Sequence, residues 1–168
     1  MRERDWNNPC PVPGDRIEAD GLVLRCLPSG GAVLISGDLE TAMAALSKDA
    51  PMIGLLAELP EKGDFALRIA RDRALLCTPE PLAIRVGWHD GYALSLADDL
   101  YIEIDISGDD DGTYLDSCMS AQGGSPSAMA VFAEKACLVA RARDAVRVWV
   151  PRADAAEVWM RLRLLSGA

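Results

Sequence analysis

Apolar residues recur at alternate positions in short blocks along the chain, and Gly, Pro, Ser and Asp separate the blocks. This period predicts short β-strands joined by turns. The first and second strands flank Pro28-Ser29-Gly30-Gly31, and the fifth and sixth flank Asp98-Asp99, so each of these pairs is expected to form a β-hairpin. The sixth strand alternates throughout and places Tyr101, Glu103 and Asp105 on one face. The expected strands are residues 21–27, 32–35, 65–69, 73–77, 91–96, 101–106, 130–140 and 146–150.

Three segments carry the period of an α-helix instead. After Ser36-Gly37-Asp38, apolar residues at positions 39, 42, 43 and 46 fall on one helical face, and Asp38 is a favourable N-cap. A second helix is expected from Ser107-Gly108-Asp109 to about Ser120. A third begins at Asp154, with an apolar stripe of Ala155, Val158, Trp159, Leu162 and Leu165.

The order of these elements repeats once along the chain. Three pairs of matching segments are separated by 70 to 72 residues, and anchors at nearly one offset predict an internal duplication. The pairs are Ile35-Ser36-Gly37-Asp38 with Ile106-Ser107-Gly108-Asp109, Ala70-Arg71-Asp72 with Ala142-Arg143-Asp144, and Gly21 with Gly91.

The predicted fold is α+β, with two tandem β-β-α-β-β units at about residues 20–87 and 90–168. One such unit cannot bury both faces of its sheet, so the antiparallel sheets of the two units are expected to pack as one body. Residues 1–14 hold three prolines and read as an extended arm, because proline fixes φ and removes a backbone donor. The predicted organisation is therefore an arm at 1–14 and a single domain at 15–168.

Composition and charge narrow the classes of function. Half of the 168 residues are hydrophobic and 26% are charged, which suits a globular domain rather than a disordered chain. The formal net charge of −9 disfavours nucleic acid as a partner. No apolar run approaches the length of a membrane span, and the first residues lack an apolar signal region. We therefore expect a cytoplasmic protein with no nucleic-acid or membrane partner.

No group of residues has the spacing of a catalytic or metal site. The single histidine, His89, and the five cysteines form no CxxC pair or metal-ligand pattern. The acidic run Asp109-Asp110-Asp111 lacks the Glu that a calcium loop requires further along. No dinucleotide-binding or nucleophile motif occurs. We expect no catalytic residue, no metal and no cofactor on this chain.

Two tryptophans lie outside the periodic apolar faces. Trp6 belongs to the proline-rich arm, and Trp88 belongs to the segment between the two units. Tryptophan is enriched among the residues that contribute most to protein interfaces. Trp6 and Trp88 are therefore predicted to contact a partner. The alternative is that both indoles pack on their own domain.

Short motifs along residues 20–168 follow the pattern of one known family. These motifs lie at residues 21–24, 35–38, 55–60, 69–76, 92–120 and 146–153. On them the chain resembles the gamma subunit of heterotetrameric sarcosine oxidase, which is related to the folate-binding fold of the aminomethyltransferase, or T-protein. The chain departs from the family at Ala74, where tryptophan is usual, and at residues 128–131, where Cys-Ala-Gln-Thr is frequent.

The resemblance implies a non-catalytic accessory subunit that binds the larger, flavin-bearing subunits of an N-methyl amino acid oxidase or dehydrogenase. FAD, FMN, NAD and tetrahydrofolate are then expected on partner subunits. One alternative is a stand-alone, folate-type small-molecule binding module with a pocket between its two units. Another is a minimal aminomethyltransferase, for which the chain is short and supplies no positioned acid or base.

Overall fold

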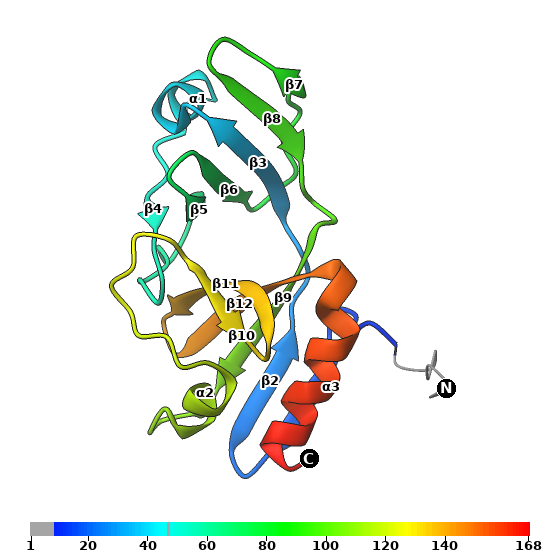
Figure 1. Ribbon diagram of the computed structural model, residues 1–168. Helices are drawn as coiled ribbons and strands as arrows, with labels where there is room; N and C mark the ends of the chain where they lie inside the picture. The colour runs from blue at the N-terminus through cyan, green and yellow to red at the C-terminus, as the bar shows by residue number, and fades with distance from the viewer. Residues whose placement is uncertain (1–8, 47) are drawn as a thin grey trace, which may run out of the picture.

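The computed structural model describes residues 9–46 and 48–168, which form two six-stranded β-sheets flanked by helices (Figure 1). The first half of the chain forms β1 (Arg16–Ala19), β2 (Leu22–Cys26), β3 (Gly31–Gly37), α1 (Leu39–Ala45), β4 (Met52–Ile53), β5 (Phe65–Ala70) and β6 (Arg73–Thr78). The second half forms β7 (Gly87–Trp88), β8 (Tyr92–Leu96), β9 (Tyr101–Ser107), α2 (Thr113–Cys118), β10 (Met129–Phe132), β11 (Lys135–Ala142), β12 (Ala145–Pro151) and, after a 3-10 turn, α3 (Ala155–Ser166). The predicted α+β class is confirmed.

Each sheet combines strands from both halves of the chain. Sheet I has the order β1-β2-β9-β12-β11-β10, and sheet II has the order β4-β5-β6-β3-β8-β7. The β1–β2 and β7–β8 hairpins each join the sheet that the other half mainly forms. The hairpins predicted from residues 21–27 with 32–35 and from 91–96 with 101–106 are therefore wrong, because the members of each pair lie in different sheets.

Backbone hydrogen bonds explain why the chain does not turn back at these two places. The Leu27 N–H donates to the Glu103 carbonyl oxygen (2.9 Å), and the Ala97 N–H donates to the Ala32 carbonyl oxygen (2.9 Å). The residues that follow β2 and β8 thus stay paired with a strand of the other half, and the chain continues into the second sheet. Figure 1 shows both connections passing from one sheet to the other.

The two sheets have corresponding strand orders and registers. When β7–β12 are taken as counterparts of β1–β6, the order of sheet I matches the order of sheet II. Ile35 on β3 lies opposite Ala74 and Leu94, while Ile106 on β9 lies opposite Val146 and Leu24. The offsets between these counterparts are again 70 to 72 residues. The duplication stays a prediction, and these registers support it.

The structure has a strand, β1, and a turn before it, and neither is among the elements expected from the sequence pattern. Only Ile17 is buried among the four residues of β1, which is too few to reveal an alternating period. Residues 9–14, the described part of the predicted arm, contain no helix or strand. The Val12 N–H donates to the Asp15 carboxylate (2.9 Å) in a turn that leads into β1.

Three hydrophobic clusters hold the layers together. One lies between sheet I and the helices α2 and α3, a second lies between sheet II and α1, and a third lies between the two sheets. Trp149 on β12 occupies the inter-sheet cluster, and Trp159 on α3 packs in the first. The predicted stripe on α3 is buried except for Leu165, which is 40% exposed near the C-terminal end.

The two Ser-Gly-Asp segments cap helices. The Asp38 carboxylate accepts a hydrogen bond from the Thr41 N–H (3.0 Å), as an N-cap side chain does. The Asp109 carboxylate accepts from the N–H groups of Tyr114 and Leu115 (2.9 and 2.8 Å). Because Asp109 reaches across a short loop, α2 begins at Thr113 rather than at the predicted position, and it ends at Cys118.

Gly37 and Gly108 belong to the same two segments and lie against the β7–β8 and β1–β2 hairpins. Gly37 and Gly108 both have positive φ values, of +104° and +79°. A Cβ on Gly37 would collide with the Gly91 carbonyl oxygen, and a Cβ on Gly108 would collide with the Gly21 carbonyl oxygen. Each glycine therefore meets the turn of the hairpin that came from the other half of the chain.

This contact predicts that Gly108→Ala destabilises the domain more than a change of backbone preference alone can explain. Gly63→Ala is the matched control, since Gly63 also has a positive φ (+90°) but no atom near the added Cβ. We expect the free energy of unfolding to fall by about 1–2 kcal/mol in the control, from the backbone conformation alone. Gly108→Ala should lose about 1–3 kcal/mol more, because the added Cβ overpacks the contact. Urea unfolding of both variants measures the difference; equal losses would contradict a tight hairpin contact.

Candidate functional site

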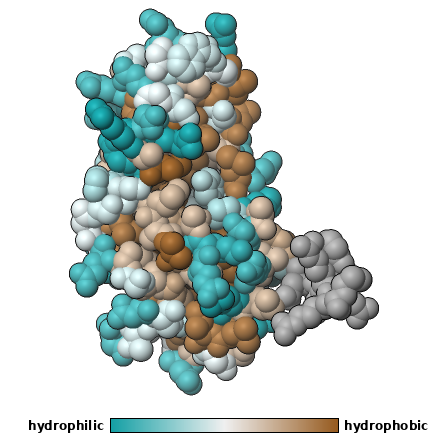
Figure 2. Space-filling model, viewed as in Figure 1, coloured by the Kyte–Doolittle hydropathy of each residue, from teal (hydrophilic) through white to brown (hydrophobic). Residues whose placement is uncertain are grey.

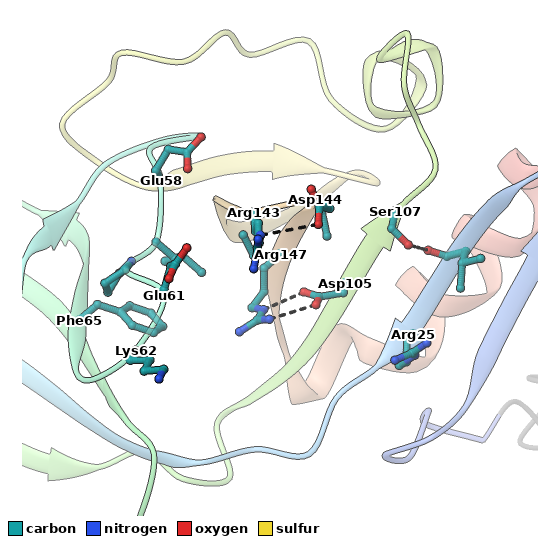
Figure 3. A pocket seen from close by; sticks show the side chains of 15 residues that line it. Arg25, Glu58, Glu61, Lys62, Phe65, Asp105, Ser107, Arg143, Asp144 and Arg147 are labelled. Carbon is teal, nitrogen blue, oxygen red and sulfur yellow. Dashed lines mark hydrogen bonds and ion pairs between the residues drawn. The ribbon is translucent and has the colours of Figure 1, made fainter.

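A cavity of about 590 Å³ lies between sheet I and the loop at residues 58–62 (Figure 3). Strands β2, β9 and β12 of sheet I form one wall, and the loop with Phe65 of β5 forms the facing wall. The β11–β12 turn forms a third side. The cavity is lined by Val23, Arg25, Glu58, Leu59, Pro60, Glu61, Lys62, Phe65, Asp105, Ser107, Ala142, Arg143, Asp144, Ala145 and Arg147.

The alternation of β9 explains how charged side chains reach this cavity. Ile102, Ile104 and Ile106 are buried in the cluster beneath α2 and α3. The residues between them are half-buried on the opposite face, as the sequence pattern predicts for Tyr101, Glu103 and Asp105. Successive strand residues point to opposite faces, so the apolar face anchors the strand while the other face lines the inter-sheet space.

Three charged side chains form a row across neighbouring strands of sheet I. Asp105 on β9 lies opposite Arg25 on β2 and opposite Arg147 on β12. The Arg147 Nε and Nη2 donate to the two Asp105 carboxylate oxygens at 2.7 and 3.0 Å. The Arg147 side chain is 25% exposed and the Asp105 side chain is 22% exposed, so solvent screens this bidentate ion pair weakly. Arg25 has no ion pair among the described residues and carries a free positive charge on the same wall.

Glu103 places a second carboxylate beside this row. Its pKa is raised above the usual value, chiefly by burial, and the positive charge of Arg147 opposes that shift. Trp149 lies directly opposite Glu103 on β12. The Trp149 indole N–H is buried and, although close to Glu103, has no partner at hydrogen-bond geometry in the described part of the chain. Glu103 therefore takes up a proton more readily than an exposed carboxylate.

The four buried cysteines do not have the environments of reactive thiols. All five thiols are free, and burial raises the pKa of Cys26 and Cys118 to about 11 and that of Cys137 to about 12. Burial also raises the pKa of Cys77. A thiolate is the nucleophile, so these protonated thiols are inert at neutral pH. The His89 Nε2 lies 2.8 Å from the Arg85 carbonyl oxygen, and the His89 ring stacks on Tyr92.

Within residues 9–46 and 48–168, no group of three or more His, Cys, Asp and Glu side chains is arranged to hold a metal ion. No helix in this part of the chain is long and apolar enough to cross a membrane.

Trp88, one of the two predicted interface residues, is not part of the cavity lining. Trp88 is on the two-residue edge strand β7 of sheet II and is 74% exposed. Trp6 lies outside the described residues. The sequence pattern predicts the polar face of β9, but it does not predict Arg147 and Arg25 as neighbours of Asp105. Those contacts depend on pairing between β9, β12 and β2, and no local pattern encodes such pairing.

Comparison with known proteins bears on the fold. No family model matches the chain, and no curated protein matches it. Among solved structures, a chain of the heterotetrameric sarcosine oxidase from Corynebacterium sp. U-96, in complex with pyrrole 2-carboxylate, is similar with a TM-score of 0.71. The alignment covers 90% of this chain and 87% of that chain, at 13% sequence identity. What the two chains share is the fold.

The environment of Glu103 predicts a pH dependence of stability. Below its usual pKa of 4.5, the carboxyl group is protonated in both the folded and the unfolded chain. As the pH rises, the unfolded chain releases this proton first, because burial raises the folded pKa. The free energy of unfolding should therefore fall from about pH 4.5 upward, until the pH passes the folded pKa. Glu103→Gln removes this site and should be more stable than the wild type above that window.

Chemical unfolding at several pH values measures the effect. The control is Glu80→Gln, at an exposed loop position whose side chain forms no ion pair in the described chain, and it should change stability little. Parallel profiles for the wild type and Glu103→Gln would show that the Glu103 carboxylate is not penalised by burial.

Proposed function

We propose that this chain is a non-catalytic accessory subunit of a sarcosine oxidase-type complex, where it binds larger, flavin-bearing subunits. The observation that carries the proposal is the shared fold with a chain of a heterotetrameric sarcosine oxidase. The alignment covers similar shares of both chains, so the matched chain is of similar length and the likeness extends over nearly all of each. In such a complex, FAD, FMN, NAD and tetrahydrofolate belong to partner subunits.

The chemistry of the described residues fits an accessory role. Four of the five thiols are buried and have raised pKa values, and His89 is bound to a backbone carbonyl in a loop. The half-buried Arg147 and Asp105 neutralise one another. The arrangement favours binding over covalent catalysis, and a subunit that works by binding needs an exposed surface with apolar anchors.

Trp88 is the best such anchor in the described chain. It is 74% exposed, and Val86, two residues earlier in the chain, is 53% exposed. Figure 2 shows hydrophobic residues along the upper right edge of the molecule, near β8. An indole that is exposed on an edge strand gains much by burial against a partner. Trp6 belongs to the same hypothesis but lies outside the described residues.

We predict that Trp88→Ala weakens binding to the larger subunits by about 1–3 kcal/mol, as expected for a buried aromatic anchor. The isolated chain should keep its thermal stability, because the indole contacts little of its own domain. Leu164→Ala on α3 is the matched control: Leu164 is 73% exposed, but it lies on the helix that covers sheet I. That variant should bind as the wild type does.

The measurement is co-purification from the native host, with mass spectrometry and flavin absorbance of the captured subunits, beside thermal melts. A wild-type chain that captures no flavin-bearing subunit would contradict the proposed function. If Trp88→Ala lowers the melting temperature while capture is unchanged, the indole packs on its own domain and the anchor is elsewhere.

A further inference from the structure

The inner faces of the two sheets differ at corresponding positions. On sheet II, Leu34 of β3 lies opposite Leu75 of β6. On sheet I, the counterparts of this pair are Asp105 of β9 and Arg147 of β12, which also lie opposite one another. On the next strand, Ser95 of β8 lies opposite Leu34, whereas Arg25 of β2 lies opposite Asp105. Sheet II carries two leucines and a serine where sheet I carries a row of three charged residues.

The fold itself does not require this charged row. Removing two charges from water costs free energy, and an apolar pair of similar volume often stabilises a protein as well or better. Leu34 and Leu75 show that the strand geometry accepts such a pair, and both are packed in the inter-sheet cluster. Asp105 and Arg147 are therefore not explained by packing, and they line the cavity of about 590 Å³ instead.

Arg147 is held in position and keeps donors for a ligand. Asp105 occupies its Nε and Nη2, while the Nη1 group donates no hydrogen bond to the described residues. Figure 3 shows Arg147 reaching from sheet I towards the wall that carries Phe65 and Lys62. Lys62 is exposed and forms no ion pair in the described chain. Lys62 and Arg25 thus border the space without an ion pair in the described chain, and Arg147, whose charge Asp105 neutralises, adds the free hydrogen-bond donors of its Nη1 group.

Phe65 gives this space a flat apolar surface. Its ring packs edge-on against the buried Trp149, with ring centroids 5.9 Å apart, so the wall is supported from behind. Pro60 and Leu59 of the loop extend the apolar part of the lining. Glu58 and Glu61 are exposed on the loop side. They disfavour an anion near the rim, so an anionic group is best placed beside Arg147.

We propose that this cavity binds a small organic anion, in which a carboxylate or phosphate group is joined to a flat apolar body. The anionic group accepts hydrogen bonds from Arg147 and faces Lys62, while the apolar body packs on Phe65. The cavity volume of about 590 Å³ is in the range of small-molecule sites. This site does not depend on the proposed subunit role, since all its residues belong to this chain.

The test is an NMR titration of the full chain with benzoate, phenyl phosphate and the neutral benzyl alcohol. We expect saturable shifts of backbone amides at residues 61–65, 105–107 and 145–147 with at least one of the two anions and much weaker shifts with the alcohol. The tighter of the two anions identifies the class of head group. Equal binding of the alcohol, or no saturable shift with either anion, would overturn the proposal.

The matching strand registers of the two sheets indicate a double substitution that removes the charged pair and keeps the fold. Asp105→Leu with Arg147→Leu installs the pair that sheet II carries at the corresponding positions, and it leaves the net charge unchanged. Anion binding should weaken at least about tenfold, as expected from the loss of a charge-assisted hydrogen bond. Lys62→Gln, at an exposed position, should weaken it less.

Arg71→Ala is the matched control, because Arg71 is an exposed arginine in the β5–β6 turn, away from the cavity lining. It should bind both anions as the wild type does. A folded double variant with unchanged affinity would show that the anion binds elsewhere. The amide spectrum and a thermal melt establish that each variant is folded.

Discussion

The β1–β2 hairpin of the first half belongs to sheet I, and the β7–β8 hairpin of the second half belongs to sheet II. The rest of the structure depends on this exchange of hairpins between the two halves. Two backbone hydrogen bonds, from Leu27 to Glu103 and from Ala97 to Ala32, keep the connecting residues paired as the chain passes from one sheet to the other. Neither sheet is complete without strands from both halves. The two halves therefore fold as one body, and the inter-sheet cluster is formed by residues from both of them.

That arrangement also creates the cavity. Its walls come from strands β2, β9 and β12 on one side and from the β4–β5 connection on the other, so residues far apart in the chain face one another only when both sheets have formed. The inter-sheet layer is apolar around Leu75, Leu138 and Trp149. It becomes charged where Asp105 and Arg147 replace an apolar pair, and this change of polarity marks the boundary between the core and the cavity.

The two proposals assign different surfaces to different tasks. Trp88 lies on the edge strand of sheet II, where a partner can approach without entering the domain. Arg147 and Phe65 lie between the sheets, where the space suits a small molecule. A chain that binds a subunit through one surface and an anion through the other needs no reactive side chain, which agrees with the raised pKa values of the buried thiols.

The sequence by itself determined most of the local elements, although the expected strand at 130–140 is two strands, β10 and β11, and the repetition stays a prediction. The alternation at Ile102, Ile104 and Ile106 predicts a strand with one buried face, and the Ser-Gly-Asp segments predict helix caps, because both depend on residues close together in the chain. Only the tertiary structure decided which strands pair between the two halves of the chain. Two consecutive strands have the same local pattern whether they pair as a hairpin or belong to different sheets. What distinguishes the two cases is hydrogen bonds to residues about 70 positions away. The row of Arg25, Asp105 and Arg147 follows from that pairing, so the candidate site could not be read from the sequence alone.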